Sequence, residues 1–306
     1  MEKADLLLVG AVDMHAHGYP YYTLRMPPRV NDYDWALSAR EAGMAGFVIK
    51  SHMWPTVSEA YLLSKVVEGI AIFGSITLNY TVGGLSPLAV QIAAESGAKV
   101  VFMPTWCSKN DVDKGCHYRD RMRPFITVID EETKDWQGIS LVDDRGNLVP
   151  QVNEIIKLCK QYDLVLASGH ISIEESLILC KSAVREGVKF VLTHPLTAPL
   201  IAASLEQMKE IARMGGYIEN VFMDCMPMHR RMHPKQIVEV IEYIGCEQCI
   251  MSSDAIEAWN PKPPEVLRMF IASLLALGVR EDAVYHMTHT NPAHLTGLDI
   301  KRDDVT

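Results

Sequence analysis

The feature that most constrains this chain is an alternation, repeated eight times, of short apolar runs rich in β-branched residues with amphipathic stretches of helical period. This pattern is typical of repeated βα units and argues against a β-sandwich or a helix bundle. The predicted strands are 7–14, 46–51, 71–78, 99–104, 164–168, 190–193, 216–223 and 249–253. Eight such strands either close into a parallel barrel or form an open doubly wound sheet.

Capping residues mark the helices that separate these strands. Ser86 followed by Pro87 is a helix start, and Ser172 with Glu175 three residues later has the spacing of a capping box. The predicted helices are 33–43, 57–68, 87–96, 151–161, 173–186, 204–214, 234–244 and 264–277. Glycines of the kind that end helices in a left-handed conformation are Gly43, Gly97, Gly187, Gly215 and Gly245.

The strongest chemical signal is a pair of histidines in the segment Asp13-Met-His15-Ala-His17, at the end of the first predicted strand. In an extended segment alternate residues share a face, so His15 and His17 are expected to project side by side. Two neutral imidazoles make half of a divalent-metal site.

Three further metal-type side chains follow the ends of other predicted strands: His170 after the fifth, His194 after the sixth and Asp254 after the eighth. With His15 and His17 they form a set that converges only if the strands close around a common axis. We therefore predict an α/β protein with a (β/α)8 TIM-type barrel. Catalytic residues stand at the C-terminal ends of the strands in this fold.

One connection is too long for a plain βα loop. Residues 106–150 follow the fourth predicted strand and contain a turn, at 142–147, between apolar runs. We predict an insertion that contains a hairpin and caps the mouth of the barrel. Since a barrel of this type takes about 250 residues, residues 1–306 are expected to form one barrel domain with this insertion.

The order H-x-H, His, His, Asp along eight βα units resembles the amidohydrolase superfamily of metal-dependent hydrolases. The likeness covers nearly the whole chain, and the sequence Asn-Pro-Ala-His-Leu-Thr-Gly-Leu at 291–298 resembles the N-P-A-x-x-x-G-L segment that often closes this family's barrels. The resemblance implies one or two divalent ions, hydrolysis at a carbon or phosphorus centre, and Asp254 as the handler of the proton of the attacking water. It implies as ligands His15, His17, His170, His194 and Asp254.

The chain departs from this family after the fourth strand, where members with two metals usually carry a bridging carboxylated lysine or a glutamate. Here that strand reads Val-Val-Phe-Met-Pro-Thr-Trp. Lys50 and His52 share one face at the end of the second predicted strand and offer replacements. A carbamate formed on Lys50 would be an anionic ligand, His52 would ligate instead, or Lys50 would bind a substrate anion. A structural salt bridge of Lys50 is the fourth interpretation.

Other polar residues on the catalytic side are weaker candidates. Glu219 on the seventh predicted strand is either an acid that supports a ligand or a partner of a basic side chain. Arg230 and Arg231 follow that strand and have the chemistry to clamp a carboxylate, although a solvated run of charges explains most such arginines. The same two interpretations apply to three arginines of the insertion, Arg119, Arg121 and Arg123.

Charge and cysteine content restrict the partners. A net charge of −9 and a pI near 5.7 give no attraction to nucleic acids or anionic membranes. No apolar run approaches the roughly 20 residues of a membrane span. The seven cysteines are scattered, without paired C-x-x-C motifs at zinc-ribbon spacing. We expect a cytoplasmic protein with a small-molecule substrate, and a homo-oligomer remains open.

Together these features predict a metal-dependent hydrolase that cleaves a cyclic amide, a lactone or a related ester through a metal-activated water. Zinc suits the His and Asp ligands best, and manganese, iron, cobalt and nickel accept them too. One alternative is a metal-dependent decarboxylase or lyase of the same superfamily. A second is a non-catalytic barrel that binds a ligand.

Overall fold

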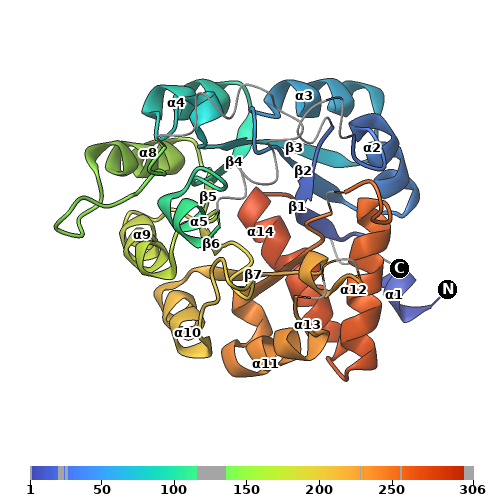
Figure 1. The fold of residues 1–306 in the computed structure, drawn as a ribbon. Helices are drawn as coiled ribbons and strands as arrows, with labels where there is room; N and C mark the ends of the chain where they lie inside the picture. Colours follow the sequence, from blue (N-terminus) through green and yellow to red (C-terminus); the bar gives the residue numbers. More distant parts are fainter. Residues whose placement is uncertain are drawn as a thin grey trace.

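The computed structural model describes residues 2–19, 24, 27–115, 136–227, 229, 231–255 and 257–299. Its strands form one parallel sheet of eight, in the order β1 to β8 along the chain (Figure 1). Two backbone hydrogen bonds join the first strand to the residues after the last strand and so close the sheet into a barrel. Asp254 N donates to His15 O (2.8 Å), and His17 N donates to Ala255 O (3.0 Å). The predicted (β/α)8 barrel is therefore confirmed. The strands are β1 (Val12–His17), β2 (Gly46–Lys50), β3 (Ala71–Thr77), β4 (Ala98–Phe102), β5 (Val165–Ala167), β6 (Phe190–Leu192), β7 (Tyr217–Val221) and β8 (Cys249–Ser252).

The helices of the outer layer begin and end close to where the capping residues predict. Ser86 accepts a hydrogen bond from Ala89 N, and the predicted capping box of Ser172 and Glu175 is formed. These helices are α2 (Asp32–Glu41), α3 (Val57–Val66), α4 (Pro87–Glu95), α8 (Pro150–Gln161), α9 (Ile173–Arg185), α10 (Leu205–Met214), α11 (Pro234–Ile244) and α12 (Pro263–Ala276). Shorter helical segments are α1 (Lys3–Leu6), η1 (Tyr80–Val82), α5 (Lys109–Lys114), η2 (Met223–Cys225), η3 (Cys246–Gln248), α13 (Glu281–Tyr285), η4 (His286–Thr290) and α14 (Asn291–Thr296).

The prediction of a first strand at 7–14 was wrong in its start. The chain forms α1, with a capping box between Glu2 and Asp5, then a turn in which Gly10 has φ +80°, and only then β1. Leu8 is buried in the outer core, so its hydrophobicity serves packing rather than strand pairing. A short apolar run by itself does not distinguish a strand from a buried helix end.

Two hydrophobic clusters lie on the two sides of the sheet. The large outer one fills the space between strands and helices, and the inner one fills the barrel with alternate strand residues such as Val48 and Val191. Leu295 of α14 belongs to the inner cluster, and Asn291 Nδ2 donates to Cys246 O (2.8 Å) and Cys249 O (2.7 Å). The segment 291–298 therefore closes the barrel at the end where β8 begins, opposite the end that carries the predicted ligands.

The insertion is described only in part, because residues 116–135 lie outside the described residues, as do Arg119, Arg121, Arg123 and Arg230. Within its described part, Ser108 forms a parallel bridge with Ile139, and Val142 forms an antiparallel bridge with Leu148 around a turn. Its role as a cap stays a prediction. Among the described residues, no helix has both the length and the apolar character that a membrane crossing requires.

Candidate metal centre

An irregularity in β1 sets the direction of its two histidines. The register pairs Asp13 with Phe47 and then Ala16 with Ile49, so β1 carries one more residue than β2 between these two pairs. This is the arrangement of a β-bulge, which locally shifts the alternation of faces along a strand.

The bulge turns the H-x-H motif into the barrel. Val12 and Met14 belong to the inner cluster, whereas Ala16, also even-numbered, belongs to the outer cluster. The alternation therefore changes phase between Met14 and Ala16, and the buried His15 and His17 face the interior. In a regular strand the two histidines would share the opposite face, because a shift of one residue reverses every side chain.

Asp13 fastens this bulge to the last strand. Its Oδ1 accepts from the backbone N of His15 (3.2 Å) and from the backbone N of Ser253 (3.1 Å). Burial raises the pKa of the Asp13 carboxyl to about 7. The residue before the H-x-H motif thus links β1 to the segment that carries Asp254.

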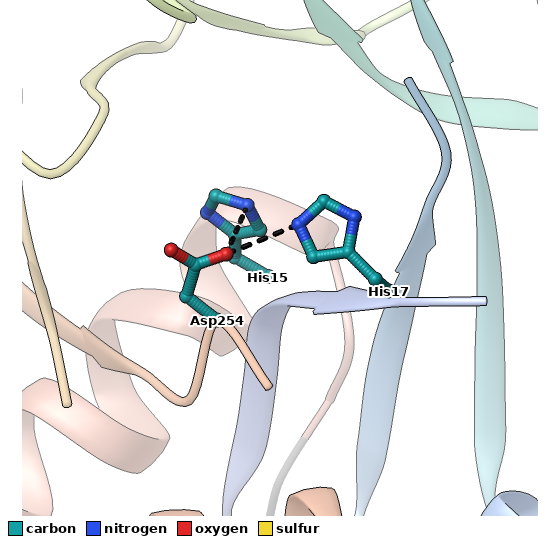
Figure 2. Close-up of side chains that lie close together, drawn as sticks. All are labelled: His15, His17 and Asp254. Atoms are coloured by element: carbon teal, nitrogen blue, oxygen red, sulfur yellow. Dashed lines mark hydrogen bonds and ion pairs between the residues drawn. The ribbon is translucent and has the colours of Figure 1, made fainter. Parts of the chain in front are cut away.

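His15, His17 and Asp254 form a compact group of ligand atoms. Asp254 Oδ1 lies 3.1 Å from Nε2 of His15 and 3.1 Å from Nε2 of His17, and the ligand atoms of the three residues all lie within 4.8 Å of one another (Figure 2). Asp254 has a backbone φ of +50°, in the left-handed region that non-glycine residues seldom adopt. Such backbone strain persists where the surroundings enforce it, and it is concentrated at functional sites.

Hydrogen bonds fix which nitrogen of His15 is protonated. Its Nδ1 lies 3.0 Å from Glu219 Oε2, and its Nε2 lies 2.8 Å from the ammonium-bearing Nζ of Lys50. Glu219 accepts at Nδ1 and Lys50 donates to Nε2, and these two contacts favour the tautomer of neutral His15 with its proton on Nδ1, against the single contact of Nε2 with Asp254 Oδ1. Glu219 is itself held by Ser252 Oγ, which donates to Oε1 (2.9 Å).

His170 is oriented by an acid from the insertion. Its Nδ1 lies 2.9 Å from Oδ2 of Asp111, which is fully buried on α5. Ser108 Oγ and Asn110 Nδ2 both donate to His170 O at 2.9 Å. With the proton on Nδ1 toward Asp111, Nε2 of His170 carries no proton, which is the state in which an imidazole nitrogen binds a cation.

His194 is oriented by a relay of two residues. Thr197 Oγ1 donates its single hydrogen to Asp224 Oδ2 (2.5 Å). The same oxygen lies 3.2 Å from Nδ1 of His194 and therefore accepts a hydrogen bond from that nitrogen. The proton of His194 is therefore on Nδ1, as in His15. Arg231 Nη1 donates to Asp224 Oδ1 (3.3 Å), so the structure uses Arg231 to neutralise this acid.

The imidazoles stand close together at the C-terminal ends of their strands. The ring centroid of His194 lies 5.9 Å from that of His15 and 5.0 Å from that of His170, and both His194 and His170 are buried. Burial and neighbouring positive charges lower the pKa values of His15, His17 and His194 well below 6.5. The rings are therefore neutral, which is the form that binds a metal.

Lys50 lies inside this group rather than beside it. Its side chain is buried, its Nζ contacts Nε2 of His15, and Phe102 lies with its ring 4.8 Å from the same nitrogen. Burial lowers the pKa of Lys50 to about 8, although Asp254 and Glu219 oppose the shift. The ammonium of Lys50 thus places a positive charge next to Nε2 of His15, as a bound cation would.

His52 extends the ring of histidines on the other side. It lies between His17, with ring centroids 4.7 Å apart, and Trp106, with ring centroids 3.7 Å apart, and both pairs are stacked. Its Nδ1 lies 2.7 Å from Thr105 Oγ1.

Sequence reasoning missed the acids that orient two of the histidines. Asp111 and Asp224 are distant in sequence from His170 and His194, and only the fold brings each pair together. The one local signal near Asp111 is Ser108, which starts α5 as an N-cap. Asp13 stands in the motif itself, but its spacing gives no sign that it holds a bulge.

The chain is similar to one protein family in sequence and to several solved proteins in structure. A family model described as "Family of unknown function (DUF6282)" matches residues 10–219, more than half of the chain. A search of curated proteins by sequence found no match.

Several solved structures share the fold over nearly the whole chain. An amidohydrolase from Pseudomonas aeruginosa is 12% identical with a TM-score of 0.64, covering 97% of this chain and 98% of its own. A metallopeptidase, the dipeptidase AC, is 12% identical with a TM-score of 0.65, covering 94% and 98%. A mutant PTE-like lactonase from Deinococcus radiodurans is 14% identical with a TM-score of 0.57, covering 95% and 97%. The resemblance to the amidohydrolase superfamily is thus confirmed at the level of the fold.

Proposed function

The chain belongs to the DUF6282 family, whose function is unknown, and we propose from its site that it is a metal-dependent hydrolase of small molecules. The observation that carries the proposal is the convergence of His15, His17 and Asp254, from the two strands that close the barrel, within 4.8 Å. Catalytic groups stand at this end of the strands in barrels of this type.

The residues present fit a divalent cation. Metal binding needs neutral imidazoles with a bare nitrogen directed at the ion and a carboxylate oxygen close by. His15, His170 and His194 each have Nδ1 engaged with a protein oxygen, which leaves Nε2 for the ion. We propose His15, His17, His170, His194 and Asp254 as ligands, for one or two ions. Zinc is our first choice, with manganese, iron, cobalt or nickel as alternatives.

A divalent ion held here would supply a water of lowered pKa and would polarise the carbonyl oxygen of the substrate. Asp254 is proposed to take the proton of that water and to return it to the leaving group. Its side chain is 17% exposed, more than His15 and His17 behind it, so it faces the side from which a substrate enters. Glu219, Asp111 and the relay through Thr197 keep the histidine protons off the nitrogens that face the ion.

Lys50 has two proposed roles that the contact with His15 supports. Nζ of Lys50 lies 2.8 Å from Nε2 of His15, so a protonated Lys50 repels a cation that binds this nitrogen. In the metal-loaded site, Lys50 therefore has to be neutral, modified or displaced. A carbamate on Lys50 removes the positive charge and adds an anionic oxygen ligand, in place of the missing acid after the fourth strand. An ammonium that swings toward the mouth would instead bind a substrate anion.

We propose cyclic amides, lactones and related esters as the substrate class. The similar structures include proteins named as an amidohydrolase, a dipeptidase and a lactonase, which is consistent with this choice. Cys159, Cys180, Cys225, Cys246 and Cys249 are free thiols, which suits the cytoplasmic location that we propose.

Metal content and turnover test the proposal together. The purified chain is expected to hold one or two divalent ions and to hydrolyse members of a panel of lactones, cyclic amides and esters. His15→Ala is expected to lose both properties. A chain that binds no transition metal after dialysis against zinc would contradict the proposal, and CO2 release without hydrolysis would indicate a lyase instead.

A further inference from the structure

His52 differs from the neighbouring histidines in the direction of its hydrogen bond. It lies among the proposed ligands, stacked on His17 and edge-on to His170 with ring centroids 5.8 Å apart. Position alone would make it a further ligand. The hydrogen bonds behind it point to another role.

The buried amide of Asn79 has an orientation that backbone groups fix. Asn79 Oδ1 accepts from Thr105 N (2.9 Å) and from Cys107 N (3.2 Å). A backbone N–H only donates, so this atom is the amide oxygen. The other amide atom, Nδ2, therefore donates to Thr105 Oγ1 (2.7 Å) and to His52 O (2.9 Å).

The hydroxyl of Thr105 belongs to a fully buried residue. Its oxygen accepts from Asn79, so its single hydrogen needs an acceptor. In the part of the chain that the structure describes, the acceptor in reach is Nδ1 of His52 at 2.7 Å. If Nδ1 carried the proton instead, this hydroxyl would lose its acceptor, at a cost of about 1–3 kcal/mol for a buried donor.

The relay from Asn79 through Thr105 therefore leaves Nδ1 of His52 without a proton. An imidazole whose Nδ1 accepts a hydrogen bond is the neutral ring, and its one N–H is then at Nε2. This is the reverse of His15, His170 and His194, whose Nδ1 atoms donate and whose Nε2 atoms are bare. A nitrogen that carries a proton does not bind a metal.

We propose that His52 is a hydrogen-bond donor of the site and not a metal ligand, and that its Nε2–H binds the carbonyl oxygen of the substrate and the oxyanion that forms from it. This assignment rests on the proposed hydrolytic function. The ring is held in place for such a role, because the rings of both His17 and Trp106 stack on it. A positioned donor of this kind stabilises negative charge without reorganisation.

Proton positions are measured directly by NMR of the full-length, zinc-loaded protein labelled with 15N-histidine. We expect a protonated Nε2 and a bare Nδ1 for His52, and the reverse for His15, His170 and His194. Thr105→Ser keeps the hydroxyl and is expected to preserve the pattern. Thr105→Val, of similar volume, removes the hydroxyl and is expected to move the His52 proton partly to Nδ1. A protonated Nδ1 of His52 in the unmodified protein would overturn the assignment.

Variants of His52 separate a donor from a ligand. His52→Ala is expected to keep the wild-type number of ions while kcat/KM falls about 10²–10³-fold, as for the loss of an oxyanion donor. His52→Gln retains an N–H and is expected to keep more activity than His52→Ala. Loss of an ion in His52→Ala, at unchanged melting temperature, would make His52 a ligand and refute the proposal.

The test does not depend on a known substrate. Acetate, a small carboxylate, is expected to shift the Nε2–H resonance of His52 and to bind more weakly to His52→Ala. If the chain hydrolyses nothing on the panel yet shows these proton positions and this shift, the hydrolytic function fails and the donor assignment stands. If hydrolysis and metal binding are present but acetate leaves the resonance unmoved, the donor assignment fails alone.

Discussion

Asp254→Asn is the substitution that most directly separates metal binding from proton transfer. The backbone at Asp254 has φ +50°, and asparagine is one of the few residues that adopt this left-handed region readily. The amide also keeps an oxygen that can occupy the position of Oδ1, 3.1 Å from Nε2 of His15 and of His17. The substitution is therefore expected to remove the proposed base while it preserves the fold and one ligand atom.

The expected loss follows from the role of a positioned base. General base catalysis contributes about 10²–10⁴-fold, which at 1.36 kcal/mol per decade is about 3–5 kcal/mol of activation free energy. We expect kcat of Asp254→Asn to fall by at least this factor. The number of bound ions is expected to stay the same, because His15, His17, His170 and His194 keep their nitrogens.

The assay combines metal analysis, melting temperature and steady-state kinetics on the best substrate of the panel. His15→Ala and His170→Ala serve as controls, since each removes a proposed ligand and is expected to lose metal and activity together. If Asp254→Asn kept most of its turnover with its metal in place, Asp254 would be a structural residue and the proposed mechanism would be wrong.

Three further predictions concern the surroundings of the site. Asp111→Asn is expected to weaken metal affinity about 10–100-fold, because His170 loses the acid that orients it. The control Asp113→Asn, on the exposed side of α5, is expected to leave metal affinity unchanged. Equal zinc affinities of the two variants in a competition assay would count against the role of Asp111. In Gly169→Ala the new Cβ would lie 2.3 Å from Met103 O, at a residue with φ +62°. We expect the free energy of unfolding, measured with denaturant, to fall by more than about 2 kcal/mol. The control Gly187→Ala has a positive φ but open space around the new Cβ, and its expected loss is about 1–2 kcal/mol. Burial raises the pKa of Asp32 to about 6, so the folded state holds this proton longer than the unfolded state and stability falls as pH rises from about 4 to about 6. As the pH rises from about 4 to about 6, the melting temperature of Asp32→Asn is therefore expected to rise relative to that of the wild type. A constant difference between the two melting temperatures over this pH range would contradict the raised pKa of Asp32.

The sequence alone determined the features that depend on local periodicity. Apolar runs and capping residues such as Ser86 and Ser172 place the strands and the outer helices, because caps and alternating faces act over a few residues. The side chains at strand ends, His15, His170 and Asp254 among them, indicate a closed barrel since only closure brings them together. The same local reasoning failed at the start of β1, where an apolar run fits a helix end and a strand equally.

Only the tertiary structure decided which face the histidines take and where their protons lie. The H-x-H spacing places His15 and His17 on one face, but the extra residue of β1 relative to β2 selects the interior, and Asp13 holds that bulge from the side of β8. The tautomers of His52 and His170 depend on Thr105 and Asp111, which are far from them in sequence. A hydrogen bond is specified by distance and direction in space, so a sequence pattern does not reveal it until the fold brings the two partners together.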